Sequence, residues 1–433
     1  MWPLTLLLLR EEYDFPRPLA IVSPRSTEEV VEVVEVSLKT GGCIVPRCGG
    51  SSVTGAVFPH RCCIFLDLSR LNKIIEFSEE DQVVHVESGI KIWDLEEWLN
   101  KRGYMLGFRP QSEKLACVGG AISCLGSGAY KPGIGNIEDS LLWVDLVTPD
   151  ASIVRLGSRY NPRGFTGPDL KRLVLGAEGG LGVVTSAGFR VRELPEDTLR
   201  LTYTFPSFEK AIGFSRKLVQ WIDPLMLRVE DSDEAKFYYG IDSTVTLIEL
   251  AGPSRVLEAV AREVDSVALR HGGKKVEELV SRWWEHRLSY NESIELVFSA
   301  GFAFDTIDVA ATWSKINNIW SRVKETLVGE KLAYMVMSHV SHFYTNGGVL
   351  YFIVVFEREV EKYWALWSRV VDIVTREGGS IVHHHGFGIL RSKWVEKELG
   401  RKQLDFLCRV KEYLDVENVF TPYGFMGRCR RVE

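Results

Sequence analysis

Glycine clusters in the first 184 residues limit what this chain can fold into more than any other feature of the sequence. The first cluster reads Pro46-Arg47-Cys48-Gly49-Gly50-Ser51-Ser52 and lies between two short apolar runs. A Gly-Gly-Ser-Ser turn between strands leaves its backbone N–H groups uncovered by bulky side chains, and such a nest of amides suits a phosphate. On the motif alone, an ordinary surface turn is the simpler interpretation.

Two further glycine-rich segments follow the first. The stretch from Gly107 to Gly135 mixes glycine with small residues, and the cluster from Gly176 to Gly182 runs straight into a strand-like run. Such stretches cannot build a bulky core, but they allow the backbone to lie flat against a ligand. Close packing of one backbone on another explains them too, so both interpretations stay open at this point.

Length and charge narrow the class of protein. A chain of 433 residues is long enough for two or three domains and a large core. Its 45% hydrophobic and 25% charged residues are typical of a soluble globular protein. The net charge of -6 argues against a general nucleic-acid binder, and no block of lysine and arginine opposes that conclusion. A small-molecule partner is therefore the default expectation.

The cysteines and the N-terminal run bear on location. None of the eight cysteines is spaced Cys-x-x-Cys, and many lie in apolar runs, where free cysteine behaves as a small hydrophobe. We therefore expect a reducing cytoplasm, in which disulfides are allowed but not implied. The apolar run from Leu4 to Leu9 is too short to span a bilayer, and no basic region precedes it as in a signal peptide. We expect it to pack on the core, with a membrane-surface contact as the alternative.

Hydrophobic periodicity predicts an α+β chain in three parts. Residues 27–40 have the pattern of an amphipathic helix with start and stop signals, and 396–414 form the last predicted helix. From about residue 196, glycine clusters give way to aromatic-rich helices and strands, an alternation typical of an antiparallel α+β domain. Glycine then returns at Gly378. We predict domains over residues 1–195, 196–375 and 376–433.

The three glycine-rich segments, in this order, resemble the FAD-binding domain of the vanillyl-alcohol oxidase / p-cresol methylhydroxylase superfamily. They are Pro46 to Ser52, Gln111 to Gly120 and Glu178 to Val184. The resemblance implies an α+β fold with a two-subdomain FAD-binding domain of the p-cresol methylhydroxylase type. It also implies an α+β cap domain with an antiparallel sheet, and a C-terminal segment that returns to the flavin. The first turn then becomes the expected cradle for the pyrophosphate.

The same resemblance assigns FAD binding to residues of these segments. No Gly-x-Gly-x-x-Gly opens a helix, so a nicotinamide site has no support. Cys48 lies in the cradle, but the pattern does not require a covalent flavin, and we expect noncovalent FAD. The predicted cofactor-binding residues are Pro46, Arg47, Cys48, Gly49, Gly50, Ser51, Ser52, Gln111, Ser112, Cys117, Val118, Gly119, Gly120, Cys124, Ser127, Glu178, Gly179, Gly180, Leu181, Gly182, Val183 and Val184.

Four motifs narrow the resemblance to alkylglycerone phosphate synthase. In that family, a tyrosine and a histidine at the places of Tyr344 and His384 are catalytic, so the resemblance assigns catalysis to these two residues. The motifs are Gly135-Asn136-Ile137-Glu138-Asp139, Thr166-Gly167-Pro168-Asp169, Ser341 to Phe352, and His383-His384-His385-Gly386-Phe387-Gly388.

The resemblance implies that the acyl group of an acylated dihydroxyacetone phosphate is exchanged for a long-chain alcohol. The flavin would then act as a covalent scaffold and not as a net redox agent. Such a reaction needs proton transfer at a carbon next to a carbonyl. His384 can move a proton near neutral pH, and Tyr344 can donate a hydrogen bond or act as a base. Without the resemblance, Tyr344 would be interpreted as a phenol at a sheet edge and His384 as a core histidine.

The nearest alternative is an FAD-dependent D-2-hydroxyacid dehydrogenase or oxidase, acting on D-lactate or glycolate. That group usually carries a His-x-Gly-Asp-Gly-Asn-x-His stretch and a Glu-His-Gly that can hold a metal. Here the stretch around Tyr344 replaces the first motif, and His384 stands where the glutamate would. On a strand, His383 and His385 would point to the side opposite His384. We therefore expect no metal site. A flavin-fold binding protein without activity is the third interpretation.

A substrate phosphate would require a guanidinium as a bidentate partner. Arg287 and Arg391 are the candidates, and His383 and His385 complete the predicted substrate-binding set. The family's phosphate-binding arginine has no clear counterpart in Asn291-Glu292-Ser293-Ile294-Glu295, so a relative with a changed substrate stays open. A homodimer, a lipid substrate and a peripheral membrane contact are expectations from the family alone.

Overall fold

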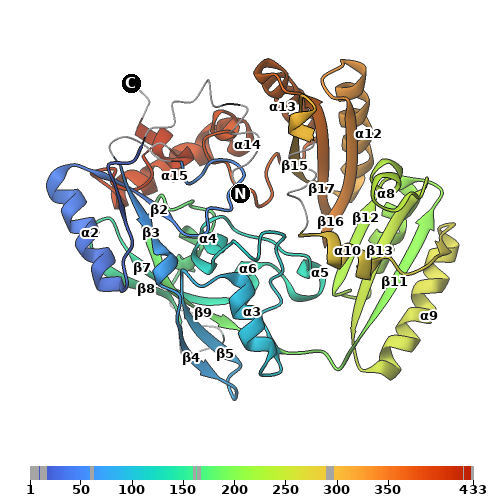
Figure 1. Ribbon diagram of the computed structural model, residues 1–433, viewed down its shortest axis with the longest axis horizontal. Coiled ribbons are helices and arrows are strands. Elements are labelled where there is room, and N and C mark those ends of the chain that lie inside the picture. The colour runs from blue at the N-terminus through green and yellow to red at the C-terminus, as the bar shows by residue number, and fades with distance from the viewer. Residues whose placement is uncertain are drawn as a thin grey trace.

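A computed structural model of the chain describes residues 9, 17–58, 63–158, 162, 167–288, 297–422 and 424–430. Figure 1 shows two lobes. The N-terminal lobe, blue to green, lies on the left. The cap lobe, green to orange, lies on the right and holds the largest sheet. This architecture is α+β, as predicted, and the cap carries the expected antiparallel sheet.

A small parallel sheet opens the N-terminal lobe, with strand order β1-β3-β2. Helix α2 connects β1 to β2. The Ser26 hydroxyl accepts the Glu29 N–H at its start, and Gly41 ends it in the left-handed conformation. The predicted helix over 27–40 therefore has these bounds in the structure. The elements are β1 (Ala20–Val22), α2 (Thr27–Thr40), β2 (Cys43–Arg47), β3 (Cys63–Asp67) and the 3₁₀ helix η2 (Leu68–Arg70).

A five-stranded antiparallel sheet follows, with strand order β4-β5-β9-β7-β8. Helices α3 and α4 pack on it around a core that includes Ile92, Val118 and Phe189. Its elements are β4 (Ile74–Ser78), β5 (Val83–Glu87), α3 (Ile92–Asn100), α4 (Val118–Ser123), α5 (Lys131–Ile134), α6 (Ile137–Ser140), β7 (Leu141–Val147), β8 (Ile153–Gly157), η3 (Leu170–Leu173) and β9 (Val183–Arg190); β6 (Tyr104–Met105) pairs with β10 (Arg192–Glu193) beside it.

The cap lobe is a seven-stranded antiparallel sheet with strand order β14-β11-β13-β12-β16-β17-β15. Its long helices bury one face of the sheet in the largest core of the molecule, while α5 of the N-terminal lobe contacts the sheet at β12 and β16. Its elements are β11 (Asp197–Phe205), α7 (Phe208–Leu218), β12 (Met226–Glu230), α8 (Ser232–Tyr239), β13 (Thr244–Gly252), α9 (Ser254–Arg270), β14 (Lys274–Lys275), α10 (Val280–His286), β15 (Phe302–Thr312), α12 (Trp313–Gly329), β16 (Met335–Tyr344), β17 (Gly347–Glu357) and α13 (Val360–Glu377).

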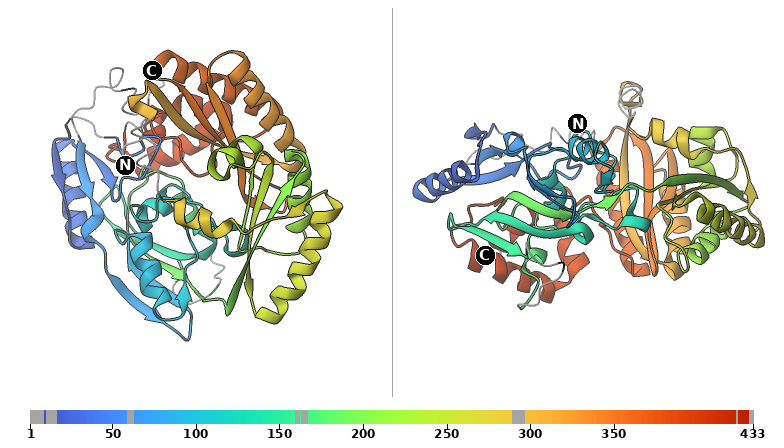
Figure 2. Two further views of the ribbon diagram at one scale, coloured as in Figure 1. Left: turned by 45° about the vertical axis from the view of Figure 1, so that its right-hand side comes forward. Right: turned by 90° about the horizontal axis from the view of Figure 1, so that it is seen from below.

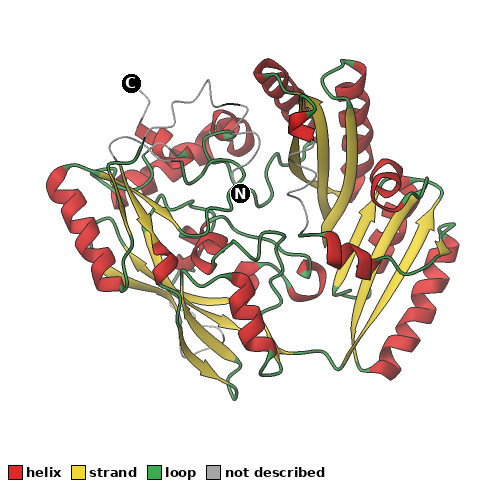
Figure 3. Ribbon diagram, viewed as in Figure 1, coloured by secondary structure: helices red, strands yellow, loops and turns green. Residues whose placement is uncertain are grey.

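The C-terminal segment returns to the N-terminal lobe. Both views of Figure 2 show its red helices beside that lobe, and Figure 3 shows them apart from the strands of the cap. Phe420 forms a parallel bridge with Ile44, and the buried Lys411 ammonium donates to the carbonyl oxygen of Gly180 at 2.7 Å. The elements are η4 (Ser392–Trp394), α14 (Val395–Leu399), α15 (Arg401–Leu414) and η5 (Phe425–Arg430).

Two expectations for this segment need correction. The predicted last helix is two helices, because the chain turns at Gly400 with a φ of 73°. The three consecutive histidines lie in a loop and not on a strand; only Ser380, before them, forms a bridge, to Ala310.

The cysteines also depart from expectation. Cys43 pairs with Cys63, Cys48 with Cys117, and Cys408 with Cys429. These residues are therefore disulfide-bonded and not free apolar side chains. Such pairings could not be read from the spacing, since the partners are 20, 69 and 21 residues apart.

At the N-terminus, Leu9 is fully buried in the cap-lobe core. The rest of the apolar run from Leu4 lies outside the described residues. Within the described part of the chain, no helix is long and apolar enough to cross a membrane.

Candidate active site

The first glycine turn directly follows β2 in the N-terminal lobe. Gly49 touches the backbone of the second segment: a Cβ built on it would lie 1.8 Å from the Leu115 carbonyl oxygen. Gly50 has a φ of 64°, which favours glycine. Among the described residues, the backbone N–H groups of Gly49, Gly50 and Ser51 have no hydrogen-bond partner. Such unpaired successive amides fit an anionic group.

Arg47 and Ser52 flank this turn. A Cβ on Gly50 would meet the Arg47 guanidinium at 2.9 Å, so that side chain lies over the turn. The Arg47 guanidinium has no hydrogen bond or ion pair within the described part of the chain, and its carbon lies 5.8 Å from the ring centroid of Phe65. The Ser52 hydroxyl accepts the Ala56 N–H at 3.2 Å and thereby closes the turn. Pro46 packs on Gly179 from the third segment.

The second segment runs into the first turn of α4 at Val118. Gly119 packs tightly on Ser88, whereas a Cβ on Gly120 would meet no atom within 4 Å. Both interpretations of this segment therefore apply, because Gly119 allows close packing and Gly120 faces open space. The Cys48–Cys117 disulfide joins the segment to the first turn.

Other residues of the second segment form hydrogen bonds or packing contacts with the rest of the chain. Gln111 donates to the Arg287 carbonyl oxygen at 3.2 Å, at the contact with the cap lobe. The carbonyl oxygen of Ser112 accepts the N–H groups of Leu115 and Ala116. Val118 is buried in the core of the lobe. These three residues therefore have structural contacts of their own.

In the third segment, Glu178 is turned away from the cradle. Its carboxylate accepts the N–H groups of Phe387, at 2.7 Å, and Gly388, so it holds the loop that follows the histidines. Burial raises its pKa to about 7. Gly179 packs on Pro46, and Gly180 packs on Met426. The segment then enters the sheet. Of its remaining predicted residues, Leu181 and Gly182 precede β9, and Val183 and Val184 begin it.

Taken together, these features fit FAD. The first turn offers free amides and a guanidinium suited to the pyrophosphate, and a Cβ on Gly120 in the second segment would face open space. Cys124 has a free thiol, and burial raises its pKa to about 12. Ser127 instead donates to the Asn136 side-chain oxygen at 2.6 Å, and so belongs to the network described next.

A row of polar residues crosses the cap sheet. Glu230 lies opposite His339, His339 opposite Tyr351, and Tyr351 opposite Asp308, so the four occupy one line across β12, β16, β17 and β15. Directly paired residues point to the same face of a sheet. His339 stacks on Tyr351 with ring centroids 4.7 Å apart. This buried polar row forms the floor of the candidate site.

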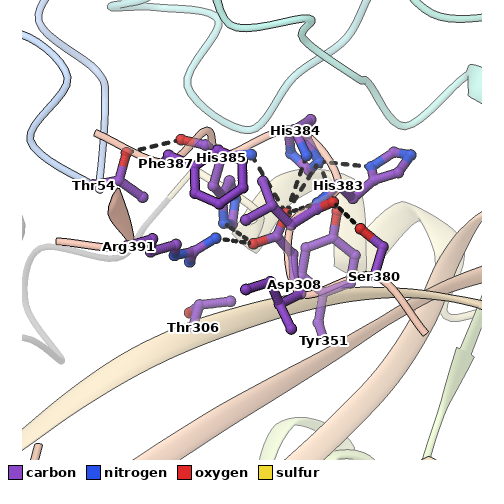
Figure 4. Close-up of polar contacts among 12 residues, drawn as sticks. Thr54, Thr306, Asp308, Tyr351, Ser380, His383, His384, His385, Phe387 and Arg391 are labelled. Atoms are coloured by element: carbon purple, nitrogen blue, oxygen red, sulfur yellow. Dashed lines mark hydrogen bonds and ion pairs between the residues drawn. The ribbon is translucent and has the colours of Figure 1, made fainter. Parts of the chain in front are cut away.

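The histidine loop is built on Asp308. One oxygen of this carboxylate accepts the backbone N–H groups of His383, His384 and His385 at 2.9, 3.1 and 3.4 Å. The other lies 2.7 Å from Arg391 and 3.0 Å from the His385 ring (Figure 4). Burial alone would raise the pKa of Asp308, but His385 and Arg391 outweigh it and hold the pKa well below its usual value.

Tyr344 pairs with His383. Its hydroxyl lies 2.7 Å from His383 Nε2 and accepts a hydrogen bond from the Asn136 amide at 3.1 Å. His384, predicted as the catalytic partner, instead lies 3.0 Å from His383 Nδ1 and 3.4 Å from the Tyr351 hydroxyl. Among the described residues, the hydrogen-bond contacts that link the phenol to His384 pass through His383.

Burial sets the protonation of the pair. It lowers the pKa of His383 to about 4 and raises the pKa of Tyr344 to about 12. Burial, aided by His385 and His383, lowers the pKa of His384 well below its usual value, so the expectation that His384 titrates near neutral pH needs correction. At neutral pH the pair is a phenol beside a neutral imidazole, which can accept a proton.

Both candidate arginines lie in buried ion pairs. Arg391 is 2% exposed and holds Asp308, while Arg287 is 4% exposed, holds Glu113 and stacks on Trp284. Neither guanidinium is free for a substrate phosphate. The stretch from Asn291 to Glu295, where the family's arginine was sought, lies outside the described residues.

Several residues of this site were missed at the sequence level. Lys131, Asn136, Asp308, His342 and Tyr351 all contact the pair or its supports. Asn136 stands in a quoted motif, so its place there was a usable signal. Asp308 and Lys131 carried no such signal, because each contacts residues far away in the sequence: Asp308 binds His383, and Lys131 binds Phe343. In the described ranges, no cluster of three or more histidine, cysteine or acidic residues could hold a metal ion.

Comparisons with known proteins show the family of both lobes. The FAD binding domain family matches residues 18–157, and the C-terminal domain family of FAD linked oxidases matches residues 194–424. An alkyldihydroxyacetonephosphate synthase of Dictyostelium discoideum (dihydroxyacetone is also called glycerone) is 26% identical over 446 residues, which cover 94% of this chain and 72% of that protein.

A second kind of relative matches over the same span. The mitochondrial cytochrome D-lactate dehydrogenase of Kluyveromyces lactis is 25% identical over 94% of this chain and 73% of its own length. Among solved structures, p-cresol methylhydroxylase with bound substrate superposes with a TM-score of 0.80 at 17% identity, over 94% of this chain and 88% of that chain.

Proposed function

This chain belongs to the FAD-linked oxidases, and within that family we propose that it exchanges the acyl group of an acyl-dihydroxyacetone phosphate for a long-chain alcohol. The observation that carries the proposal is the 2.7 Å contact between the Tyr344 hydroxyl and His383 Nε2. An exchange of this kind needs proton transfer but no net oxidation. A phenol with a neutral imidazole behind it supplies that chemistry.

The roles of the residues follow from their contacts. His383 Nε2 accepts the proton of Tyr344 while the phenol oxygen takes a proton from the substrate carbon next to the carbonyl. The carboxylate departs with that proton, and when the alcohol adds, its own proton passes back through the same pair to the substrate carbon. Asn136 holds the phenol oxygen, and Asp308 holds the backbone of His383. When bound, FAD would supply an electron-deficient ring that accepts an electron pair from the substrate.

We propose that the FAD is noncovalent. The cysteine of the cradle, Cys48, is paired with Cys117 and so has no thiol for a thioether bond. Denaturation in trichloroacetic acid tests this: the yellow colour should appear in the supernatant. A pellet that keeps the flavin would contradict noncovalent binding.

A second candidate is an FAD-dependent dehydrogenase or oxidase of D-2-hydroxyacids. It is favoured by one observation, because Arg287 and Arg391 both lie in buried ion pairs and neither can take a substrate phosphate. A smaller anionic substrate would not need them. The 25% identical D-lactate dehydrogenase relative is consistent with this alternative.

One substrate screen separates the two candidates. Holoenzyme is mixed anaerobically with D-lactate or glycolate, and separately with palmitoyl-dihydroxyacetone phosphate plus hexadecanol. The proposal expects an oxidised flavin spectrum in the first case and an ether product in the second. Rapid bleaching of the flavin by a hydroxyacid, without ether formation, would overturn the exchange reaction in favour of the dehydrogenase.

A further inference from the structure

Lys131 reaches from the N-terminal lobe onto the strand that carries Tyr344. It opens helix α5, which packs on β12 and β16 of the cap. Its ammonium donates to the Phe343 carbonyl oxygen at 2.6 Å and lies 3.1 Å from the centroid of the Tyr344 ring. One side chain therefore contacts both the backbone and the ring at the end of β16.

The backbone at this point is irregular. The pairing of β16 with β17 shifts between Ser341 and Tyr344, and His342 between them has a φ of 48°. A bulge of this kind changes the direction in which the next side chain points. The ladder is locally disrupted at such a bulge, and the Lys131 ammonium binds the Phe343 carbonyl oxygen within it. The hydrogen bond therefore fixes the bulge that directs Tyr344 toward His383.

The charge of Lys131 is not neutralised by a contacting carboxylate. Throughout the described part of the chain, no acidic oxygen lies within 4.0 Å of its ammonium. Burial lowers its pKa to about 8, opposed by Asp139, Asp223 and Glu138 further away. The other titratable groups on this side are His342, whose ring stacks 5.7 Å from His383, and the Tyr344–His383 pair itself. At neutral pH the ammonium is therefore mostly charged.

We propose that Lys131 is a positioning residue that clamps Tyr344 and favours its phenolate form. A cation over an aromatic face is attracted to the ring's electron density, and this attraction grows when the phenol loses its proton. The inference rests on the proposed function only in taking Tyr344 as the group that moves a proton. The contacts of Lys131 with Phe343 and Tyr344 involve neither FAD nor substrate, so they can be tested without the reaction.

The experiment therefore measures the phenol itself and not turnover. Tyr344 is replaced by 3,5-difluorotyrosine, whose phenol ionises nearer neutral pH, and the ¹⁹F shift is followed against pH in the full chain. The parent is compared with Lys131→Met, Lys131→Gln and Lys131→Arg. Glutamine keeps an N–H donor for the Phe343 carbonyl without the charge, and arginine keeps the charge. If the methionine variant fails to fold, the glutamine variant carries the test.

The expected result is a rise in the phenol pKa of about 1 unit in the methionine and glutamine variants, with the arginine variant close to the parent. Lys393→Met is the matched control, because its ammonium lies 3.6 Å from the ring centroid of Trp364, away from the site. It should leave the titration unchanged. A phenol pKa that does not move in Lys131→Gln would overturn the proposal, even if ether formation were absent for other reasons.

Discussion

The cofactor cradle and the histidine loop are both nests of successive backbone amides, but one is open and the other is filled by the protein. The amides of Gly49, Gly50 and Ser51 have no partner among the described residues. Those of His383 to His385 converge on one oxygen of Asp308. Successive backbone amides therefore have two uses in this molecule. The open nest can bind an anion, and the nest filled by Asp308 fixes a loop.

The surroundings of the two nests explain the difference. The cradle consists of small residues, and its glycines are required by close backbone contact at Gly49 and by the positive φ of Gly50. Asp308 is fully buried and has both His385 and Arg391 beside it. We therefore expect changes at the filled nest to affect catalysis and stability, and changes at the cradle to affect FAD binding.

Tyr344→Phe should give the largest effect and separate the two regions most clearly. Removing the hydroxyl bound to His383 should lower kcat for acyl exchange by about 10²–10⁴-fold, because proton transfer is lost. FAD content, measured as flavin absorbance per protein, should stay at the parent value. Tyr334→Phe, at a phenol that is 77% exposed, is the control and should keep full activity.

The choice of histidine is tested in the same assay. Because His383 and not His384 contacts the phenol, His383→Ala should lower kcat more than His384→Ala. Equal losses of kcat would contradict the choice of His383 as the partner of the phenol. Loss of FAD from either variant would contradict the separation of the two nests.

Asp308→Asn should produce the next largest effect, on stability. It removes the charge opposite Arg391 and His385, and leaving a buried charge unpaired costs about 3–5 kcal/mol of unfolding free energy. Guanidinium denaturation of the apoprotein measures this. The matched control is Asp372→Asn, in the more exposed ion pair with Lys397, with an expected cost of at most about 1 kcal/mol.

The sign of the pH effect follows from the pKa of Asp308. Because the folded protein holds this pKa well below 3.8, its contribution to stability is present above pH 3.8 and is lost as the pH falls through the folded value. Asp308→Asn should therefore lose more stability at pH 7 than at the lowest pH where the parent stays folded. A constant difference across this range would count against the charged role of Asp308.

The acid limb of the rate profile should lie far below the usual histidine value. His383 must be neutral to accept a proton, and burial lowers its pKa from 6.5 to about 4. As the pH falls, kcat/KM should thus hold through 6.5 and decline only near pH 4. Measured initial rates with far-UV circular dichroism at each pH distinguish this from unfolding. An acid limb near 6.5 would show that the catalytic base is exposed.

Glycine substitutions in the cradle and in α4 should give the smallest and most selective effects. Gly120→Ala has open space for its Cβ and lies in α4, so it should stabilise the apoprotein by about 0.5–1 kcal/mol while weakening FAD binding. Gly49→Ala should instead weaken both, because its Cβ meets the Leu115 carbonyl. Thermal unfolding and quenching of FAD fluorescence report the two quantities. Unchanged FAD affinity in Gly120→Ala would mean that this glycine does not face the cofactor.

How far the sequence predicts this molecule depends on how local each feature is. The helix at Thr27–Thr40 and the glycine turn are contiguous in sequence, and each carries its own signals of capping or backbone freedom. They were predicted for that reason. The resemblance also named Tyr344 and the histidine motif.

The pairing within the site could not be read in the same way. It depends on a bulge at His342 and on three amides folding around Asp308, some 75 residues earlier. Neither feature has a sequence period, and a strand geometry was the natural assumption for three consecutive histidines. Two carboxylates hold the loop. The sequence indicated no role for Asp308, and it indicated a cofactor-binding role for Glu178.

The loop from His383 to Gly388 is tied to one carboxylate in each lobe, Asp308 in the cap and Glu178 in the N-terminal lobe. This has a consequence for biosynthesis. A ribosome delivers the cradle and the cap before this loop, so a nascent chain can complete most of its hydrophobic cores while it still lacks the partner of Tyr344. Under the proposed function, proton transfer therefore begins only when the last part of the chain has been released and has folded back.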